Sequence, residues 1–218
     1  MRNMFDRELE ALNLDLIKMG GMVEDSIEKA MTALKTQNAE LAQMAIHYDK
    51  AIDEMDRNIE SKCLKLLLHQ QPVASDLRLI STALKMITDM ERIGDHASDI
   101  SETFLRMSNE KYIKELVHIP IMGDTVSKML KGSIDAFVKR DIELAEQVIK
   151  MDDEVDKLFD ILKNDLIELM IKDNKNVDQA IDLLMIAKYL EKIGDHAENI
   201  ADWAIFSVTG EHKHKRIL

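Results

Sequence analysis

A decapeptide that occurs twice sets the main restriction on the fold of this chain. Residues 91–100 read ERIGDHASDI and residues 191–200 read EKIGDHAENI, so seven of ten positions are identical at an offset of 191 − 91 = 100 residues. Each copy places carboxylates four residues apart, which is about one turn of an α-helix. The chain is therefore a duplication, and both halves kept the same acidic face.

The duplication extends beyond the decapeptide. The apolar positions from Leu16 to Leu34 return 103 residues later, from Ile119 to Phe137. The tripeptide ELA at 40–42 returns at 143–145 with the same offset. The offset then falls from 103 to 100, because the turn at 173–176 is about three residues shorter than the turn at 70–75. Turns are where insertions are tolerated.

The spacing of apolar residues predicts helices throughout. They fall three or four positions apart, as on a helix with one buried face, and no segment alternates with the period of a strand. Asn38 and Asp141 are good N-caps, and Pro72 favours a turn at 71–73. The expected helices cover residues 3–35, 39–69, 75–107, 119 to the Asp141 cap, that cap to the turn at 173–176, and 177–208.

These six helices predict an all-α protein of two tandem three-helix bundles related by internal duplication. Three amphipathic helices joined by short connections pack antiparallel around one core. The mixed, polar segment 108–117 is the expected junction, so the domains would cover residues 1–109 and 110–218. With 15 Met and 4% aromatic residues, the cores should be aliphatic and filled by methionine. Gly20 and Gly21 lie inside the first helix, where we expect close contact with a neighbouring helix.

Composition and charge exclude several classes of protein. A formal charge of −12 argues against nucleic acid as the main partner, because phosphate binding needs clustered Lys and Arg. The single cysteine, Cys63, rules out an internal disulfide and a thiolate zinc site, and it is expected to be a small buried residue. The start of the chain lacks the pattern of a signal peptide and no apolar run would span a bilayer, so we expect a cytoplasmic protein. The basic tail at 210–218 is expected to be a solvated, frayed end.

Carboxylates gather on two helices of each half. Residues four and seven apart lie within about 40° and 20° of one another on a helix, so the carboxylates of each decapeptide line one stripe. The preceding, antiparallel helix adds an Asp-x-x-x-Asp pair. The stripe and the pair together comprise Asp49, Asp53, Glu91, Asp95 and Asp99 in the first half, and Asp152, Asp156, Glu191 and Asp195 in the second, where Asn199 replaces the fifth carboxylate.

Such faces favour a bound cation. Like charges one turn apart destabilise a helix by a few tenths of a kcal/mol, and a glycine inside it costs about 1 kcal/mol more. Mg²⁺, Mn²⁺, Ca²⁺ and iron suit oxygen ligands of this kind, and the residues leave the identity open, with zinc held by carboxylates also possible. The alternative is a solvated acidic face neutralised by residues such as Arg92 and Lys188. His96 and His196 are expected to flank the stripe as structural residues.

The chain resembles the PhoU family over nearly its full length. The resemblance is carried by QPVASDLR at 71–78, both copies of the decapeptide, the Asp pairs at 49/53 and 152/156, and VTGE at 208–211. It implies two three-helix bundles whose acidic motifs hold multinuclear metal clusters. The metal residues carried over are the nine carboxylates given above, with the second site weakened by Asn199.

The resemblance also implies a function. PhoU-like proteins restrain the phosphate-starvation response when phosphate is plentiful, by linking the ATPase of a phosphate transporter to a sensor histidine kinase. We therefore expect a regulator of phosphate uptake that is not an enzyme, that forms a homodimer, and that meets the membrane only through its partners.

Two further hypotheses remain open from the residues. One is a carboxylate-bridged di-iron enzyme, but such bundles use Glu-x-x-His, whereas His96 follows Glu91 by five positions and leaves the carboxylate face. The other is a metal-free helical scaffold whose acidic stripe docks a basic partner.

Overall fold

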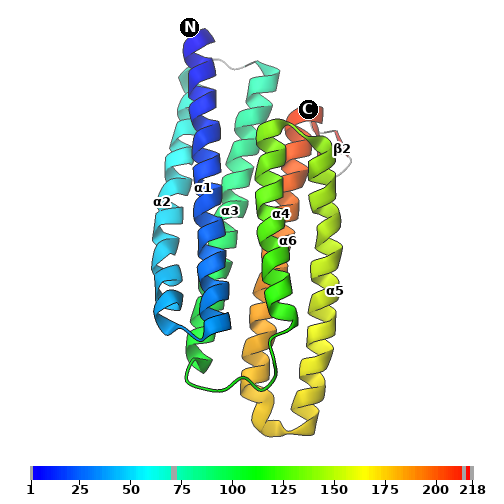
Figure 1. Cartoon of the computed structure of the whole chain (residues 1–218). Helices are drawn as coiled ribbons and strands as arrows, with labels where there is room; N and C mark the ends of the chain where they lie inside the picture. The colour runs from blue at the N-terminus through cyan, green and yellow to red at the C-terminus, as the bar shows by residue number, and fades with distance from the viewer. Residues whose placement is uncertain (1, 70–72, 213–214, 217–218) are drawn as a thin grey trace.

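A computed structural model describes residues 2–69, 73–212 and 215–216 as six long, nearly parallel helices (Figure 1). The helices are α1 (Arg2–Thr36), α2 (Ala39–His69), α3 (Ala74–Met107), α4 (His118–Lys139), α5 (Ile142–Lys172) and α6 (Val177–Thr209), with a 3₁₀ turn, η1, at Asn174–Asn176. A hairpin of two-residue strands, β1 (Glu211–His212) and β2 (Lys215–Arg216), follows α6. The all-α prediction is confirmed, and helix ends match within one or two residues.

The predicted caps form as expected. The Asn38 side chain accepts hydrogen bonds from the backbone N–H groups of Glu40 and Leu41, at 3.0 and 3.1 Å. Asp141 accepts one from the N–H of Leu144 at 3.0 Å. Each cap satisfies donors that the first turn of a helix leaves without an intrahelical partner. Gln71 and Pro72, where a turn is expected, lie outside the described residues.

The core follows the apolar stripe of each helix. Leu16, Met19, Val23 and Ile27 of α1 are all fully buried, which confirms the spacing argument. Methionine fills the core as predicted, since Met19, Met86, Met90 and Met122 are completely buried. Cys63 is also fully buried, and this burial raises the pKa of its thiol to about 12.

The two bundles meet mainly through α3 and α6. Arg106 of α3 pairs with Asp182 of α6 at 2.9 Å, and His196 of α6 lies 2.8 Å from Asp89 of α3. Positions that rise along one helix pair with positions that fall along the other, so α3 and α6 are antiparallel. The decapeptides consequently lie beside each other at the centre of the molecule, where the rings of His96 and His196 are 5.7 Å apart.

A second contact between the bundles joins α1 to α4 through two glycines. A Cβ added to Gly20 would lie 2.2 Å from Cδ1 of Ile134, and one added to Gly123 would lie 2.7 Å from Cε of Met31. Gly20 and Gly123 are 103 residues apart, as are Met31 and Ile134, so the contact is reciprocal between repeats. The expected close contact is thus confirmed for Gly20. It is wrong for Gly21, which is exposed with nothing within 4 Å of an added Cβ.

Hydrogen bonds hold the segment 108–117 against both bundles. The side chain of Gln179 in α6, which is 5% exposed, accepts from the N–H of Ile113 at 2.6 Å and donates to the carbonyl of Lys111 at 3.1 Å. The Tyr112 hydroxyl donates to the carbonyl of Leu34 at the end of α1. The junction therefore ties the end of the first bundle to the start of α6.

The tail corrects one expectation. Residues 210–218 were expected to be a frayed end, but Glu211 and His212 form β1 and pair with Arg216 and Lys215 of β2. His212 is 16% exposed and packs on Trp203 of α6. The spacing argument misses this hairpin because the contacts of His212 with Trp203 and Asp202 follow no periodic pattern. Residues 213–214 and 217–218 of the tail lie outside the described part.

Candidate metal centre

The first acidic face brings together two helices that run side by side. Asp49 and Asp53 lie one turn apart on α2, and Asp95 projects from α3. One carboxylate oxygen of each lies within 4.8 Å of the other two, and in the described part of the chain this is the one group of three that could hold a metal ion. Three of the five residues predicted for the first site are therefore gathered around one point.

The remaining two predicted residues border this group. The Glu91 side chain is 27% exposed, and one of its oxygens lies 3.5 Å from Nε of Arg92. Asp99 is 41% exposed and lies 3.4 Å from Nδ1 of His96. Arg92 also pairs with Asp95 at 3.1 Å, so the neutralising role considered for Arg92 is realised in part. Glu91 and Asp99 are neighbours of the group rather than members of it.

Glycine in the decapeptide lets the two helices approach at this face. A Cβ at Gly94 would lie 3.1 Å from Ile52 and 3.4 Å from a carboxylate oxygen of Asp49. In the second bundle a Cβ at Gly194 would lie 2.9 Å from a carboxylate oxygen of Asp152. Glycine inside a helix costs about 1 kcal/mol relative to alanine. Here it gives room for the aspartate that faces it.

The electrostatics of Asp49 favour a positive charge. Burial raises its pKa to about 6, and repulsion from Asp95, Asp53, Asp99 and Glu102 adds to the rise. Its Oδ1 is buried and has no hydrogen-bond partner. Unpaired buried oxygens are costly, and a metal ion would supply the missing partner while favouring the ionised carboxylates. The donor set is all oxygen and fits a hard cation.

The second acidic face repeats this arrangement of carboxylates on two neighbouring helices, and lysines lie beside two of the carboxylates. Asp152 faces α6 as Asp49 faces α3, and its Oδ1 is likewise buried without a partner. Burial raises the pKa of Asp152 to about 7, followed by repulsion from Glu198, Asp156, Asp195 and Glu191. Asp156 is exposed, although its pKa is also raised, first by burial and then by Glu191 and Asp195.

Two lysines neutralise part of this second face. Lys188 lies 2.6 Å from Glu191, and Lys192 pairs with Asp195 and lies 3.4 Å from Glu191. Glu191 and Asp195 thus pair with lysines of their own helix, α6. That the first bundle holds the fuller site stays a prediction.

Glu198 is a residue of this face that the sequence reasoning missed. Among the charged neighbours that raise the pKa of Asp152 it is the largest contributor. Its counterpart in the first half is Ser98, so the second half has gained a carboxylate at 198 beside the one it lost at Asn199. That neighbouring exchange was the available signal, since Glu198 follows Glu191 by seven residues and therefore lies within about 20° of it on the helix.

The histidines of the decapeptides do not belong to the group formed by Asp49, Asp53 and Asp95. His196 contacts Asp89 at 2.8 Å, and the ring of His96 stacks on Tyr189 with centroids 5.7 Å apart. Both imidazoles lie where α3 meets α6, as the five-residue spacing predicts. The pKa of His96 is lowered, mainly by burial. The Glu-and-His ligand set of di-iron bundles is therefore not assembled at these positions.

The fold and the acidic faces together define a class of protein: an all-α, internally duplicated chain with a carboxylate-rich face on each three-helix unit. The model of the PhoU domain matches this chain twice, at residues 16–104 and 119–204. The chain belongs to the PhoU family.

Individual relatives agree with this assignment. A "phosphate-specific transport system accessory protein PhoU homolog" from Clostridium acetobutylicum is 41% identical over 211 residues, which covers 96% of each chain. The crystal structure of PhoU from Pseudomonas aeruginosa is 35% identical and matches 95% of this chain and 100% of its own, with a TM-score of 0.92. The phosphate transport system regulatory protein PhoU from Streptococcus pneumoniae is 28% identical and matches 95% of this chain and 98% of its own, with a TM-score of 0.89.

None of the helices in the described ranges carries an apolar stretch that could cross a membrane.

Proposed function

We propose that this protein is an accessory regulator of a phosphate-specific transport system that restrains phosphate-starvation signalling when phosphate is plentiful. Its proposed partners are the transporter ATPase and a sensor histidine kinase. Support comes from relatives named as phosphate-specific transport accessory proteins that match almost the whole chain. The proposed place of action is the cytoplasm, as a homodimer that meets the membrane only through these partners. The two repeats are proposed as domains of residues 1–109 and 110–218.

We further propose that the acidic faces hold metal ions in this role. The observation that carries this proposal is the group formed by Asp49, Asp53 and Asp95, with oxygens within 4.8 Å of one another and a buried, unpartnered oxygen on Asp49. Asp152, Asp156, Glu191 and Asp195 would form the second site, with Glu198 as an added neighbour. Glu91 and Asp99 would border the first. Iron, manganese, magnesium and carboxylate-bound zinc remain the candidate ions.

A non-enzymatic role is favoured over di-iron catalysis. Both imidazoles of the decapeptides are engaged between α3 and α6, at Asp89, Asp99 and Tyr189. A bound metal would therefore be held by carboxylates alone, and its proposed role is to fix α2 against α3 and α5 against α6. Oxygen consumption by the iron-loaded, reduced protein would instead support the enzyme hypothesis.

The metal proposal is tested by elemental analysis of protein purified without added metal. Compared with wild type, Asp49→Asn with Asp95→Asn should lose the larger part of the bound metal. The matched control is Asp25→Asn with Asp135→Asn, which removes two half-buried carboxylates that pair with lysines on their own helices. Equal metal in the two double variants would overturn the site.

The regulatory proposal is tested separately in cells that lack the gene. Expression of a phosphate-starvation reporter should stay high at abundant phosphate without the protein and fall when wild type is restored. Affinity capture of the transporter ATPase and the kinase with the full chain tests the partners. A reporter that responds equally with and without the protein would contradict the proposed role, whatever the metal content.

A further inference from the structure

Repeat-equivalent positions of the two acidic faces differ in charge. At four positions the second face is less acidic or more basic than the first, and at one position it is more acidic. With the residue of the first face given first, the pairs are Asp56 and Phe159, Glu60 and Lys163, Thr88 and Lys188, Asp99 and Asn199, and, in the opposite direction, Ser98 and Glu198. The second face thus carries lysines at two positions where the first face has none.

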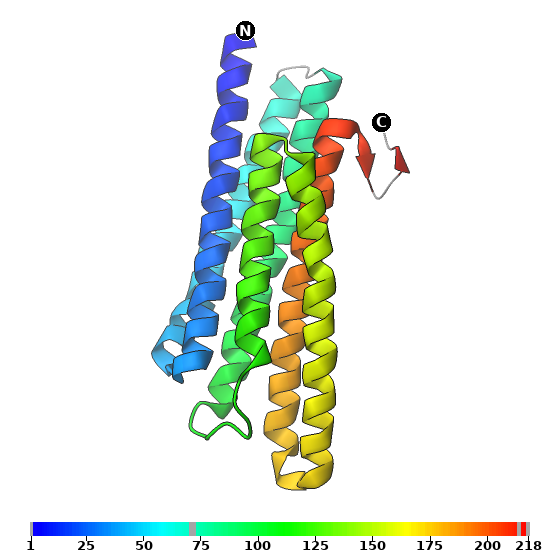
Figure 2. The same ribbon diagram turned by 45° about the vertical axis from the view of Figure 1, so that its right-hand side comes forward.

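One of these lysines, Lys188, lies between the two helices of the second face, α5 and α6, which run side by side (Figure 2). Its ammonium group is 2.6 Å from Oε2 of Glu191, whose side chain is only 13% exposed. The same ammonium lies over the ring of Phe159 of α5, 5.4 Å from the ring centroid. An aromatic face attracts a cation placed in this way. Lys188 therefore contacts a carboxylate of its own helix and a ring of the neighbouring helix.

The charge of Lys188 also acts on the carboxylates of α5. Burial raises the pKa of Asp156, repulsion from Glu191 and Asp195 adds to the rise, and the positive charge of Lys188 opposes it. The ammonium thus stabilises ionised carboxylates on both helices of the second face, which is what a bound cation would do.

The first face has a neutral side chain at the equivalent position. The hydroxyl of Thr88 donates to a backbone carbonyl one turn earlier, at 3.2 Å, so it brings no charge to Glu91. Arg92 and Lys192 each contact the glutamate of their own decapeptide, at 3.5 and 3.4 Å. That cation is common to both faces, whereas the cation at Lys188 is additional.

The carboxylates of the second face are also less closely gathered. Asp49, Asp53 and Asp95 place oxygens within 4.8 Å of one another, whereas their equivalents, all in the described part of the chain, form no such group. The equivalent of Asp53 is Asp156, which is exposed. The face that carries the additional lysine is therefore the one with the looser set of metal ligands.

We propose that Lys188 is a built-in cation of the second acidic face, so that a metal ion binds this face only by displacing the ammonium group from Glu191. This inference rests on the proposed metal-binding role of the acidic faces. A lysine ammonium is a compact point charge with three donors, and it repels a divalent ion that approaches the same carboxylate. The first face would then hold metal at concentrations where the second remains metal-free, and the packing of α5 on α6 would not require metal.

The test is a titration of the full-length protein with Mn²⁺, followed by isothermal calorimetry. Asp49→Asn with Asp95→Asn removes the first face and leaves the second as the site measured. In this background Lys188→Met should raise the affinity for Mn²⁺ on the order of tenfold, because one repelling charge is removed at contact distance. Lys188→Arg keeps the positive charge and should bind Mn²⁺ as weakly as the background.

The matched control is Lys139→Met in the same background. Lys139 pairs with Asp135 on its own helix, α4, away from both acidic faces, and its loss should leave the affinity unchanged. A second readout is thermal melting. Mn²⁺ at a fixed concentration should raise the Tm of the Lys188→Met protein more than that of the background, and a chelator should reverse this rise.

The reciprocal variant places the lysine on the first face. Thr88 is exposed, so Thr88→Lys in the otherwise wild-type chain has room for the longer side chain. It should lower the affinity of the first face for Mn²⁺, again on the order of tenfold. Far-UV circular dichroism verifies that each variant keeps its helices.

The outcomes separate this inference from the proposed function. Equal affinities of the background and of Lys188→Met would overturn the inference, as would unchanged binding in Thr88→Lys. If the wild type binds Mn²⁺ at the first face in either of these cases, the metal-binding role stands and only the built-in cation is refuted. Failure of both the wild type and Lys188→Met to bind Mn²⁺ would count against both proposals.

Discussion

Alanine at Gly20 and alanine at Gly21 should change stability in opposite directions. The two glycines are consecutive in α1 and share its helical backbone, so replacement by alanine gains about 0.5–1 kcal/mol of helix propensity at either. Gly21 is exposed, with nothing within 4 Å of an added Cβ. Gly21→Ala should therefore stabilise the protein by roughly that amount.

At Gly20 the added methyl group meets Ile134. The Cβ would lie 2.2 Å from Cδ1 of Ile134, whereas carbon atoms in contact are about 3.5–4.0 Å apart. The end of the isoleucine must move in a site where it is only 7% exposed. Overpacking of this kind costs about 1–3 kcal/mol, which exceeds the gain in propensity. Gly20→Ala should be destabilising by about 0.5–2 kcal/mol once both effects are combined.

The assay is urea unfolding followed by circular dichroism, with thermal melting as a second measure. For a chain of this size 1 kcal/mol corresponds to about 2–4 °C in Tm. Ile134→Val removes Cδ1, and in a double-mutant cycle with Gly20→Ala it should recover about 1 kcal/mol of the loss. If Gly20→Ala stabilises as much as Gly21→Ala, or if the cycle shows no coupling, the packing argument is wrong.

Three further outcomes are expected. The folded, metal-free protein keeps protons on Asp49 and Asp152 up to about pH 6 and 7, whereas the unfolded chain loses them near 3.9. Its stability should therefore fall as pH rises from about 4 to 7. Asparagine at both positions should remove most of that slope, on the order of 1 kcal/mol per site after allowing for solvent screening, as measured by urea unfolding at pH 5 and pH 8. Gln179→Ala leaves the partly buried N–H of Ile113 without its acceptor and should cost about 1 kcal/mol, visible as a lower urea midpoint at unchanged m-value. Gly194→Ala places a methyl group 2.9 Å from Asp152 Oδ1 and should lower metal bound at the second face, whereas Gly94→Ala, at 3.4 Å from Asp49, should affect the first face less.

The periodic features of the chain were predictable from its residues. The apolar stripe of α1, the caps at Asn38 and Asp141 and the antiparallel pairing of the acidic helices follow from local spacing, and the duplication makes each inference twice. The close approach at Gly20 was predictable for the same reason, because a glycine on a buried face indicates a neighbouring backbone or side chain.

Contacts between the repeats were beyond that reasoning. Helical period shows which face of α3 is apolar, but not that His196 meets Asp89 across the bundle interface. Only the packing of α4 shows which side chain meets Gly20, namely that of Ile134. His212 escaped for a related reason, since its contacts with Trp203 and Asp202 have no periodic pattern.

The junction pinned by Gln179 was only partly foreseen. Its polar composition indicated a connection, whereas its fixed course depends on single hydrogen bonds to α6 and α1. Individual hydrogen bonds of this kind produce no periodic pattern of residues in the sequence.

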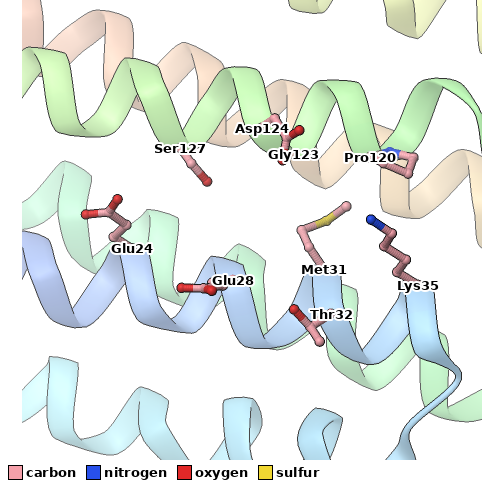
Figure 3. Close-up of a pocket in the computed structure, with 9 residues that line it drawn as sticks. All are labelled: Glu24, Glu28, Met31, Thr32, Lys35, Pro120, Gly123, Asp124 and Ser127. Atoms are coloured by element: carbon pink, nitrogen blue, oxygen red, sulfur yellow. The ribbon is translucent and has the colours of Figure 1, made fainter.

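A pocket lies between α1 and α4 beside the reciprocal glycine contact, with Met31 and Gly123 at its wall (Figure 3). Subtracting 103 from the residue numbers of the second repeat gives both repeats one numbering. In that numbering the contact of Met31 with Gly123 and the contact of Ile134 with Gly20 join the same two positions. That exchange is the rule for isologous interfaces of twofold homodimers. The surface between the halves therefore has the form of an isologous subunit interface, although both of its sides belong to one chain.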